Sequence, residues 1–186
     1  MIQLDVLAVG SLIRDGTVIK EAHSTSTLIR TGERNIVVDT SSEYMLPMIK
    51  ESLKQLRVLP KDVDTIVLTH SHHDHASNNA LFRKAKVYVR KEERYDGDVI
   101  VKEDTELCDG IRLVHTPGHT EGSMSVFVTS DINYAMAGDA IPLEENFRRM
   151  VPPGINTDAR LAVESIKAIT SYADMVVPGH GLPFRK

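Results

Sequence analysis

The most constraining feature of this chain is a run of histidines that directly follows a short apolar segment. The residues from Thr65 to Leu68 are predicted to form a buried strand, and the run His70-Ser71-His72-His73-Asp74-His75 begins just after it. Strands fix the positions of the side chains at their ends, and catalytic groups gather on the loops that follow. A flexible surface tract of histidines would not usually start at a buried strand. The run therefore predicts a metal site at the edge of a sheet.

Similar residues follow four other predicted strands. They are His119 after Thr116-Pro117-Gly118, Asp139 after Ala137-Gly138, His180 after Pro178-Gly179, and Asp39 after Val37-Val38. A glycine beside such a residue lets the backbone turn sharply, or leaves room for a metal and its substrate. We expect these strand ends to meet at one place.

The candidate ligands are numerous enough for two metal ions. A catalytic zinc typically has three protein ligands and one open position for water. Two such centres need about six ligands and a group that bridges the ions. Imidazole and carboxylate ligands suit zinc, and also iron or manganese. We assign His70, His72 and His119 to one centre, Asp74, His75 and His180 to the other, and Asp139 to the bridge.

Three further residues are weaker candidates for the site. Asp39 either accepts the second N–H of a ligand histidine or only holds the turn that follows it. His73 lies inside the run without a ligand role, so it could support a ligand, face the substrate or point into solvent. His23 precedes a predicted strand and could border the pocket.

The substrate has to be recognised by the loops. Residues 10–23 and 140–157 are predicted loops that are long enough to form the walls of a pocket. Arg148 and Arg149 in the second loop could bind a phosphate or a carboxylate. The alternative is that they form a solvated pair of charges.

Short β-branched runs alternate with two helical patterns along the chain. Neither an internal repeat nor a linker interrupts the 186 residues, so we expect a single domain over residues 1–186. The patterns alone leave α/β and α+β folds open. The predicted strands are 4–9, 27–29, 36–38, 65–68, 86–89, 111–114, 125–128, 134–137 and 175–177, and the helices are 42–56 and 158–171.

Composition excludes several classes of function. The net charge of −4 argues against a broad basic surface for nucleic acid, and 5% aromatic residues without tryptophan argue against extended base stacking. The N-terminus does not resemble a signal peptide, and no apolar run approaches the ~20 residues of a membrane helix. With its single cysteine, Cys108, the chain cannot form an internal disulfide. We expect a cytoplasmic protein without a membrane partner. Its oligomeric state is open, a dimer included.

The motifs together resemble those of the metallo-β-lactamase superfamily. They are His70-x-His72-x-Asp74-His75, Thr116-Pro117-Gly118-His119-Thr120, Gly138-Asp139 and Pro178-Gly179-His180-Gly181, in the order of that family. The resemblance implies an α+β fold of four layers, an αβ/βα sandwich with helices outside two mixed sheets and metals at one rim. Residues 173–185 and the short chain resemble the metallo-β-lactamase domain-containing protein 1 group, whose vertebrate member is regarded as an endoribonuclease.

We therefore expect a hydrolase that uses a hydroxide held between two divalent metals, most consistently zinc. Asp74 and Asp139 are the expected catalytic residues, the first orienting the nucleophile and the second bridging the metals. The expected substrate is a small-molecule ester, thioester, lactone or phosphodiester, with RNA included. One alternative is a mononuclear iron dioxygenase of the persulfide-oxidising kind, and another is a metal-binding module without catalysis.

Overall fold

The structure, a computed structural model, describes residues 2–186. The strands are β1 (Gln3–Ala8), β2 (Ser11–Asp15), β3 (Val18–His23), β4 (Ser26–Arg30), β5 (Asn35–Val38), β6 (Thr65–Val67), β7 (Lys86–Arg90), β8 (Val99–Val101), β9 (Thr105–Cys108), β10 (Ile111–His115), β11 (Met124–Thr129), β12 (Asn133–Gly138), β13 (Met175–Pro178) and β14 (Phe184–Arg185). The α-helices are α1 (Leu46–Gln55), α2 (His73–Ala76), α3 (Glu144–Arg149) and α4 (Ala159–Tyr172).

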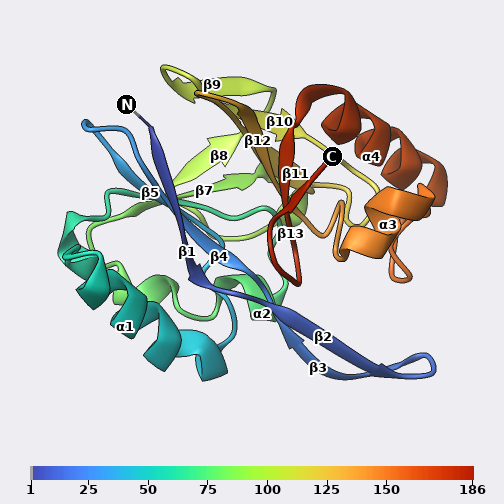
Figure 1. The fold of residues 1–186 in the computed structure, drawn as a ribbon, viewed down its shortest axis with the longest axis horizontal. Coiled ribbons are helices and arrows are strands. Elements are labelled where there is room, and N and C mark those ends of the chain that lie inside the picture. The colour runs from blue at the N-terminus through green and yellow to red at the C-terminus, as the bar shows by residue number, and fades with distance from the viewer. Residues whose placement is uncertain (1) are drawn as a thin grey trace.

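Most of the strands belong to two six-stranded sheets, which Figure 1 shows with helices on their outer sides. The first sheet has the order β1-β4-β5-β6-β7-β8, and the second has the order β14-β13-β12-β11-β10-β9. Both sheets are mixed. In the first, β5, β6, β7 and β8 run parallel to one another, whereas β4 is antiparallel to β5. In the second, β12 and β13 are parallel, whereas β11 is antiparallel to β12.

The middle strands are buried on both faces, so their side chains supply two cores in alternation. In β5, Ile36 and Val38 belong to the cluster between the two sheets, whereas Val37 belongs to the cluster on the outer face. In β12, Met136 faces the opposite sheet, while Ala135 faces the helices outside the second sheet. This alternation requires a covering layer outside each sheet.

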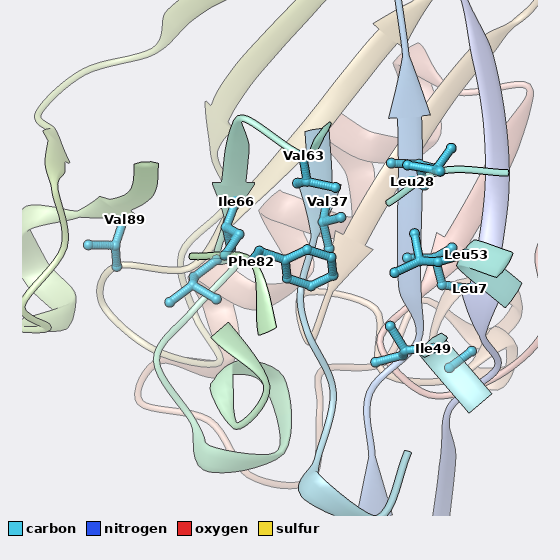
Figure 2. Packing of buried hydrophobic residues seen from close by; sticks show 12 residues of the cluster. Leu7, Leu28, Val37, Ile49, Leu53, Val63, Ile66, Phe82 and Val89 are labelled. Carbon is cyan, nitrogen blue, oxygen red and sulfur yellow. The ribbon is translucent and has the colours of Figure 1, made fainter. Parts of the chain in front are cut away.

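Helix α1 covers the outer face of the first sheet. Its buried residues Ile49 and Leu53 pack in one cluster with Leu28 and Ile66 of the sheet and with Phe82. Figure 2 shows the Phe82 ring beside Ile66. Removing a buried side chain of this kind costs about 2–5 kcal/mol, so this layer contributes a large part of the stability.

Helix α4 covers the second sheet. Asp158 caps its N-terminus by accepting a hydrogen bond from the Leu161 N–H at 2.9 Å. Ile166 and Ile169 of the helix are buried with Val176 of the sheet. The predicted four-layer α+β sandwich is therefore confirmed. Within residues 2–186, no helix is long and apolar enough to cross a membrane.

Residues 10–23, which we predicted to be a loop, form the hairpin of β2 and β3. Figure 1 shows this hairpin projecting beyond the two sheets. Its strands are mostly exposed, so they lack the alternation of buried and exposed positions that marks a half-buried strand. Asp15-Gly16, with Gly16 at a φ of 60°, was the usable signal, because Asp-Gly favours a tight hairpin turn.

The predicted loop 140–157 was also only partly correct, since it contains helix α3. The histidine run likewise contains a helical turn, α2, that begins at His73. Both helices are short, and a single turn or two gives too few residues for a helical period to be recognised in the sequence.

Candidate metal centre

The candidate ligands lie at the carboxyl ends of the strands that form the middle of each sheet. His70 follows β6, and Asp139 and His180 follow the parallel neighbours β12 and β13. Parallel strands have their carboxyl ends at the same edge of a sheet. The rims of the two sheets meet here, so residues far apart in the sequence become neighbours. The short distances below show that the structure brings all seven candidates together.

The first group consists of three histidines. The Nε2 atom of His70 lies 3.0 Å from Nδ1 of His72, and Nε2 of His119 lies 3.0 Å from the same Nδ1 atom. One nitrogen of each ring could bind a single metal ion. His70 and His119 are buried, whereas His72 is exposed, so the group is accessible from one side.

The second group consists of Asp74, His75 and His180. The Oδ2 atom of Asp74 lies 3.9 Å from Nε2 of His75 and 3.7 Å from Nε2 of His180. These three atoms are also arranged so that they could bind one ion. The two histidines are buried and Asp74 is partly exposed, so this group too has an accessible side.

Asp139 lies between the two groups and presents one oxygen to each. Its Oδ2 atom is 3.5 Å from Nε2 of His119 in the first group. Its Oδ1 atom is 3.4 Å from Nε2 of His75 and 3.2 Å from Nε2 of His180 in the second group. This is the arrangement that a bridging carboxylate requires.

Hydrogen bonds from the outward-facing nitrogens of His119 and His180 orient their rings. The Nδ1 atom of His119 donates to the Ile155 carbonyl at 2.8 Å, and that of His180 donates to the His23 carbonyl at 2.8 Å. A carbonyl can only accept, so in each neutral ring the Nε2 atom carries the lone pair and faces the centre. Metal-binding histidines typically have such a partner on the second nitrogen.

His75 is oriented by Asp39. Its Nδ1 atom lies 2.7 Å from Oδ2 of Asp39, and both side chains are buried. Of the two interpretations of Asp39, the structure therefore favours the first, in which the carboxylate accepts the second N–H of a ligand histidine.

Two buried polar atoms at the centre lack a hydrogen-bond partner among the residues described. They are Nε2 of His75 and Oδ1 of Asp139. An unsatisfied buried polar atom is costly, and so are lone pairs of several rings within about 3 Å of one another. Divalent cations would satisfy all of these atoms at once, so the residues fit a metal centre.

Charges at the centre shift the pKa values of its groups. Burial lowers the pKa of His70 well below its ordinary value. Burial acts in the same direction on His75, but the Asp39 and Asp139 carboxylates outweigh it and raise the His75 pKa well above the ordinary value. Burial would raise the Asp139 pKa, yet His180 and His75 hold it well below the usual range. Asp139 and these two histidines thus favour one another's charged forms.

Two glycines beside the centre leave space for neighbouring side chains, Gly179 for Asp139 and Gly138 for Thr69. A Cβ atom at Gly179 would lie 2.1 Å from Oδ1 of Asp139, and one at Gly138 would lie 2.3 Å from the hydroxyl oxygen of Thr69. Gly138 also has a φ of 51°, which disfavours other residues. Glycine is thus required beside these ligands for close approach.

Glu93 connects the two segments that carry the first group. Its Oε2 atom accepts hydrogen bonds from the N–H and the hydroxyl of Ser71, both at 2.7 Å. Its Oε1 atom accepts from the hydroxyl of Thr120, next to His119, at 2.5 Å. This role could not be predicted, because Glu93 lies in a different segment of the chain and matches no motif.

A small cavity of about 80 Å³ opens over the centre, and we call it the slot. A larger hollow of about 850 Å³ at the other ends of the strands contains none of the candidate ligands, so its size does not make it the functional site. The slot is lined by Leu12, Arg14, Ile19, Ala22, His72, Asp74, His119, Asp139, Pro142, Pro153, Ile155 and His180.

The structure does not bring Arg148 and Arg149 to the slot. Both lie on the exposed surface of α3, where Arg148 pairs with Glu144 at 2.9 Å and Arg149 with Glu145 at 2.6 Å. Glutamate at i and arginine at i+4 on one helix face explain the pairing. The arginine that lines the slot is Arg14, which was missed because the hairpin was missed.

His23 and His73 lie beside the centre and do not line the slot. The His23 ring is within hydrogen-bond distance of the Ser42 hydroxyl at 2.7 Å, and only its carbonyl contacts His180. The His73 side chain is 81% exposed and lies 3.2 Å from Glu43. Among the three interpretations of His73, the structure therefore favours the solvated one.

Comparison with known proteins identifies the family. A probable metallo-hydrolase of Methanocaldococcus jannaschii is 40% identical over 179 residues, which cover 96% of this chain and 87% of that protein. Residues 19–104 match the family profile described as the metallo-beta-lactamase superfamily. The chain belongs to this superfamily.

The resemblance to the domain-containing protein 1 group is also confirmed. The metallo-beta-lactamase domain-containing protein 1 of Xenopus laevis is 31% identical over 174 residues, which cover 89% of this chain and 73% of that protein. A crystal structure of a quorum-quenching N-acyl homoserine lactone lactonase has a TM-score of 0.75, with 23% identity, and covers 96% of this chain and 91% of that one. That structure supports the fold. The predicted enzyme class, a hydrolase of the metallo-β-lactamase superfamily, is confirmed by the names of these relatives.

Proposed function

We propose that this hydrolase uses two divalent cations, most consistently zinc, to cleave an ester, thioester, lactone or phosphodiester. His70, His72 and His119 would bind one cation, and Asp74, His75 and His180 the other. Asp139 would bridge them. Two complete ligand sets favour this proposal over a mononuclear iron dioxygenase, which needs only one set.

The observation that carries the proposal is the position of Asp139 between the two groups. One of its oxygens faces His119, and the other faces His75 and His180 at 3.4 and 3.2 Å. Because Oδ1 is buried without a hydrogen-bond partner among the described residues, that oxygen is available to a cation. A carboxylate that served only to hold the fold would have its hydrogen bonds satisfied by the protein.

A bound pair of divalent cations supplies a water of lowered pKa as nucleophile and a positive charge for the oxygen of the scissile bond. The chain contributes orientation. Asp74 lines the slot and its side chain is 24% exposed, so it can accept a hydrogen bond from the attacking water. His72 and His119 of the first group and Asp74 and His180 of the second line the same slot, so a scissile bond bound there would lie beside both groups.

The size of the slot and the similar proteins narrow the range of possible substrates. A cavity of about 80 Å³ can accept one small chemical group, such as the ester group of a small molecule or the end of a single nucleic-acid strand. The lactonase of the same fold supports the inclusion of lactones. RNA is retained as a candidate on the resemblance described in the sequence analysis alone, and the screen below tests it.

A hydrolase screen with zinc- or manganese-loaded protein tests the proposal. Its substrates are a phosphodiester, a short RNA, a lactone, a thioester and a β-lactam. We expect at least one to be cleaved, and Asp139→Ala to reduce that rate by about 100-fold or more, the usual effect of losing a group that stabilises charge. Asp131→Ala, in an exposed turn, is the matched control.

Two results would overturn the proposal. Cleavage that survives Asp139→Ala would come from a contaminant. One iron per chain, together with oxygen uptake that depends on a persulfide, would establish the dioxygenase instead.

A further inference from the structure

Two apolar segments and one arginine line the slot. Leu12, Ile19 and Ala22 belong to the hairpin. Pro142, Pro153 and Ile155 belong to the segment between β12 and α4. Arg14 lines the same slot, and among the residues described it is the only arginine or lysine that does so.

The pairing of the hairpin explains why Arg14 faces the slot. Arg14 lies opposite Ile19, and Leu12 lies opposite Ala22. Residues directly opposite each other on antiparallel strands present their side chains on the same face. The register shifts between Ile13 and Arg14, as in a β-bulge, and a bulge re-aims the side chains that follow it.

Arg14 reaches the segment between β12 and α4. Its Nη1 atom lies 2.6 Å from the position that a Cβ atom would occupy at Gly154. Glycine at 154 therefore makes room for the guanidinium, which spans the space between the hairpin and residues 153–155.

The charge of Arg14 is not used by the protein. Lys20 on the same hairpin pairs with Asp15 at 3.8 Å, and Arg160 pairs with Glu164 at 3.3 Å. Within residues 2–186, no carboxylate lies at ion-pair distance from Arg14. A guanidinium presents parallel N–H donors that match the two oxygens of a carboxylate or phosphate.

We propose that Arg14 is a specificity-determining residue that binds an acidic group of the substrate, separated from the scissile bond by a short apolar segment. The acidic group is a carboxylate or a phosphate. The apolar segment lies between Leu12 and Ile155, and the scissile bond lies over the candidate ligands. This inference rests on the proposed function, because that function places the reacting bond at the metal centre.

A pair of variants separates the position of the guanidinium from its charge. Arg14→Gln removes the charge. Gly154→Ala retains the charge and adds a methyl group that meets only the tip of Arg14, with Nη1 at 2.6 Å and Cζ at 3.6 Å, so the tip must move. Lys20→Gln is the control, since it removes a charge from the same hairpin away from the slot.

Binding is measured first, because it does not depend on turnover. The probes are the dicarboxylates from succinate to adipate, each compared with its monomethyl ester by calorimetry on the metal-loaded protein. One carboxylate can occupy the centre, and the other can reach Arg14. We expect one chain length to bind about 10- to 100-fold more tightly than its monoester, the usual gain from hydrogen bonds to a charged group. This gap in affinity between the dicarboxylate and its monoester should disappear in Arg14→Gln, shrink in Gly154→Ala and persist in Lys20→Gln.

Hydrolysis of matched aryl esters distinguishes the two acidic groups. The acyl chains end in a carboxylate, a phosphonate or a neutral methyl ester. Arg14→Gln should raise KM for the preferred acidic ester by about 10- to 100-fold and leave the neutral ester unchanged. If the full hydrolase screen finds no activity but the binding gap depends on Arg14, the proposed function fails, whereas the binding of an acidic group by Arg14 stands. If the gap is absent, or survives Arg14→Gln, the inference is wrong whatever the enzyme cleaves.

Discussion

The Asp39 carboxylate lies 2.7 Å from Nδ1 of His75, and both side chains are buried. The same carboxylate also accepts hydrogen bonds from Thr69, from its N–H at 2.8 Å and from its hydroxyl at 2.7 Å. Asp39 thus connects the end of β5 with the segment that leads from β6 into the histidine run. One side chain orients a candidate ligand and also holds two neighbouring strand ends in place.

Asp39→Asn should therefore weaken metal binding. The amide has no negative charge to support His75, and loss of such a partner typically reduces metal affinity by about 10- to 100-fold. Competition with a chromogenic chelator measures the affinity of each site. Because His75 belongs to the second group, only one of the two binding steps should change. Equal loss at both steps, or no loss, would count against the assigned role of Asp39, and Asp131→Asn serves as the control.

Metal binding should release protons near neutral pH. Burial lowers the pKa of His75 and of His180, but nearby carboxylates outweigh it and raise both values above the ordinary histidine value. An unperturbed histidine titrates near pH 6.5, so in the metal-free protein these two keep their protons at somewhat higher pH. A cation must displace those protons.

The apparent metal affinity should therefore rise with pH up to the folded-state pKa values of these two histidines, which lie above the ordinary histidine value, and level off beyond them. Calorimetry in buffers of different ionisation enthalpy gives the number of protons released. Metal uptake at pH 7 without proton release would show that the two histidines are already neutral.

Glu93→Ala should loosen the first group. The substitution leaves the Ser71 N–H and the hydroxyl groups of Ser71 and Thr120 without their shared acceptor. We expect a loss of about 1–3 kcal/mol in the free energy of unfolding, measured by urea denaturation of the metal-free protein. Glu121→Ala, at an exposed position next to Thr120, should change it by less than about 0.5 kcal/mol. Glu93 has no such role if the two variants are equally stable.

Gly179→Ala should disrupt metal binding by displacing Asp139. The added Cβ atom would lie 2.1 Å from Oδ1 of Asp139, a distance that ordinary contacts never reach. We expect fewer bound ions per chain in this variant than in the wild type, measured by elemental analysis after dialysis. Gly16→Ala is a useful comparison, because nothing lies within 4 Å of its added Cβ atom, although its φ of 60° makes it strained too. Full metal content in Gly179→Ala would mean that Asp139 does not bridge.

Replacement of Arg148 and Arg149 by glutamine should leave hydrolysis unchanged. Their guanidinium groups are paired with Glu144 and Glu145 on the surface of α3. Exposed pairs of this type contribute about 0.3–0.5 kcal/mol, so replacing Arg149 should barely change stability. Replacing Arg148 should cost more, because its guanidinium also donates to the Arg185 carbonyl at 2.7 Å. A loss of more than about tenfold in kcat/KM would return these arginines to the list of substrate-binding residues.

The candidate ligands could be found from sequence because each follows a strand and sits in a short motif. The fold places those strand ends together, and the predicted seven residues are the ones that meet. The partners of the ligands could not be found in this way. Glu93 and the Ile155 carbonyl reach the centre from distant segments, and no local pattern records such contacts. The role of Asp39 was left between two interpretations, since only the distance to His75 separates them.

The hairpin of β2 and β3 could not be predicted from the sequence for a different reason. Its residues are exposed, so the hydrophobic pattern that defines buried strands is absent, and only Asp15-Gly16 signals the turn. Without the hairpin, Arg14 could not be placed at the slot. Arg148 and Arg149 were chosen instead because they lie in a segment close to Asp139 in the sequence, although their helix directs them to solvent.

The central claim is that Asp139 bridges two metal ions, and a crystal structure of the zinc-loaded protein tests it most directly. Anomalous diffraction at the zinc edge locates the ions independently of the protein atoms. We predict two ions about 3.5–4 Å apart, one within His70, His72 and His119, the other within Asp74, His75 and His180, with one Asp139 oxygen on each. A single ion per chain, or two ions without contact to Asp139, would contradict this account.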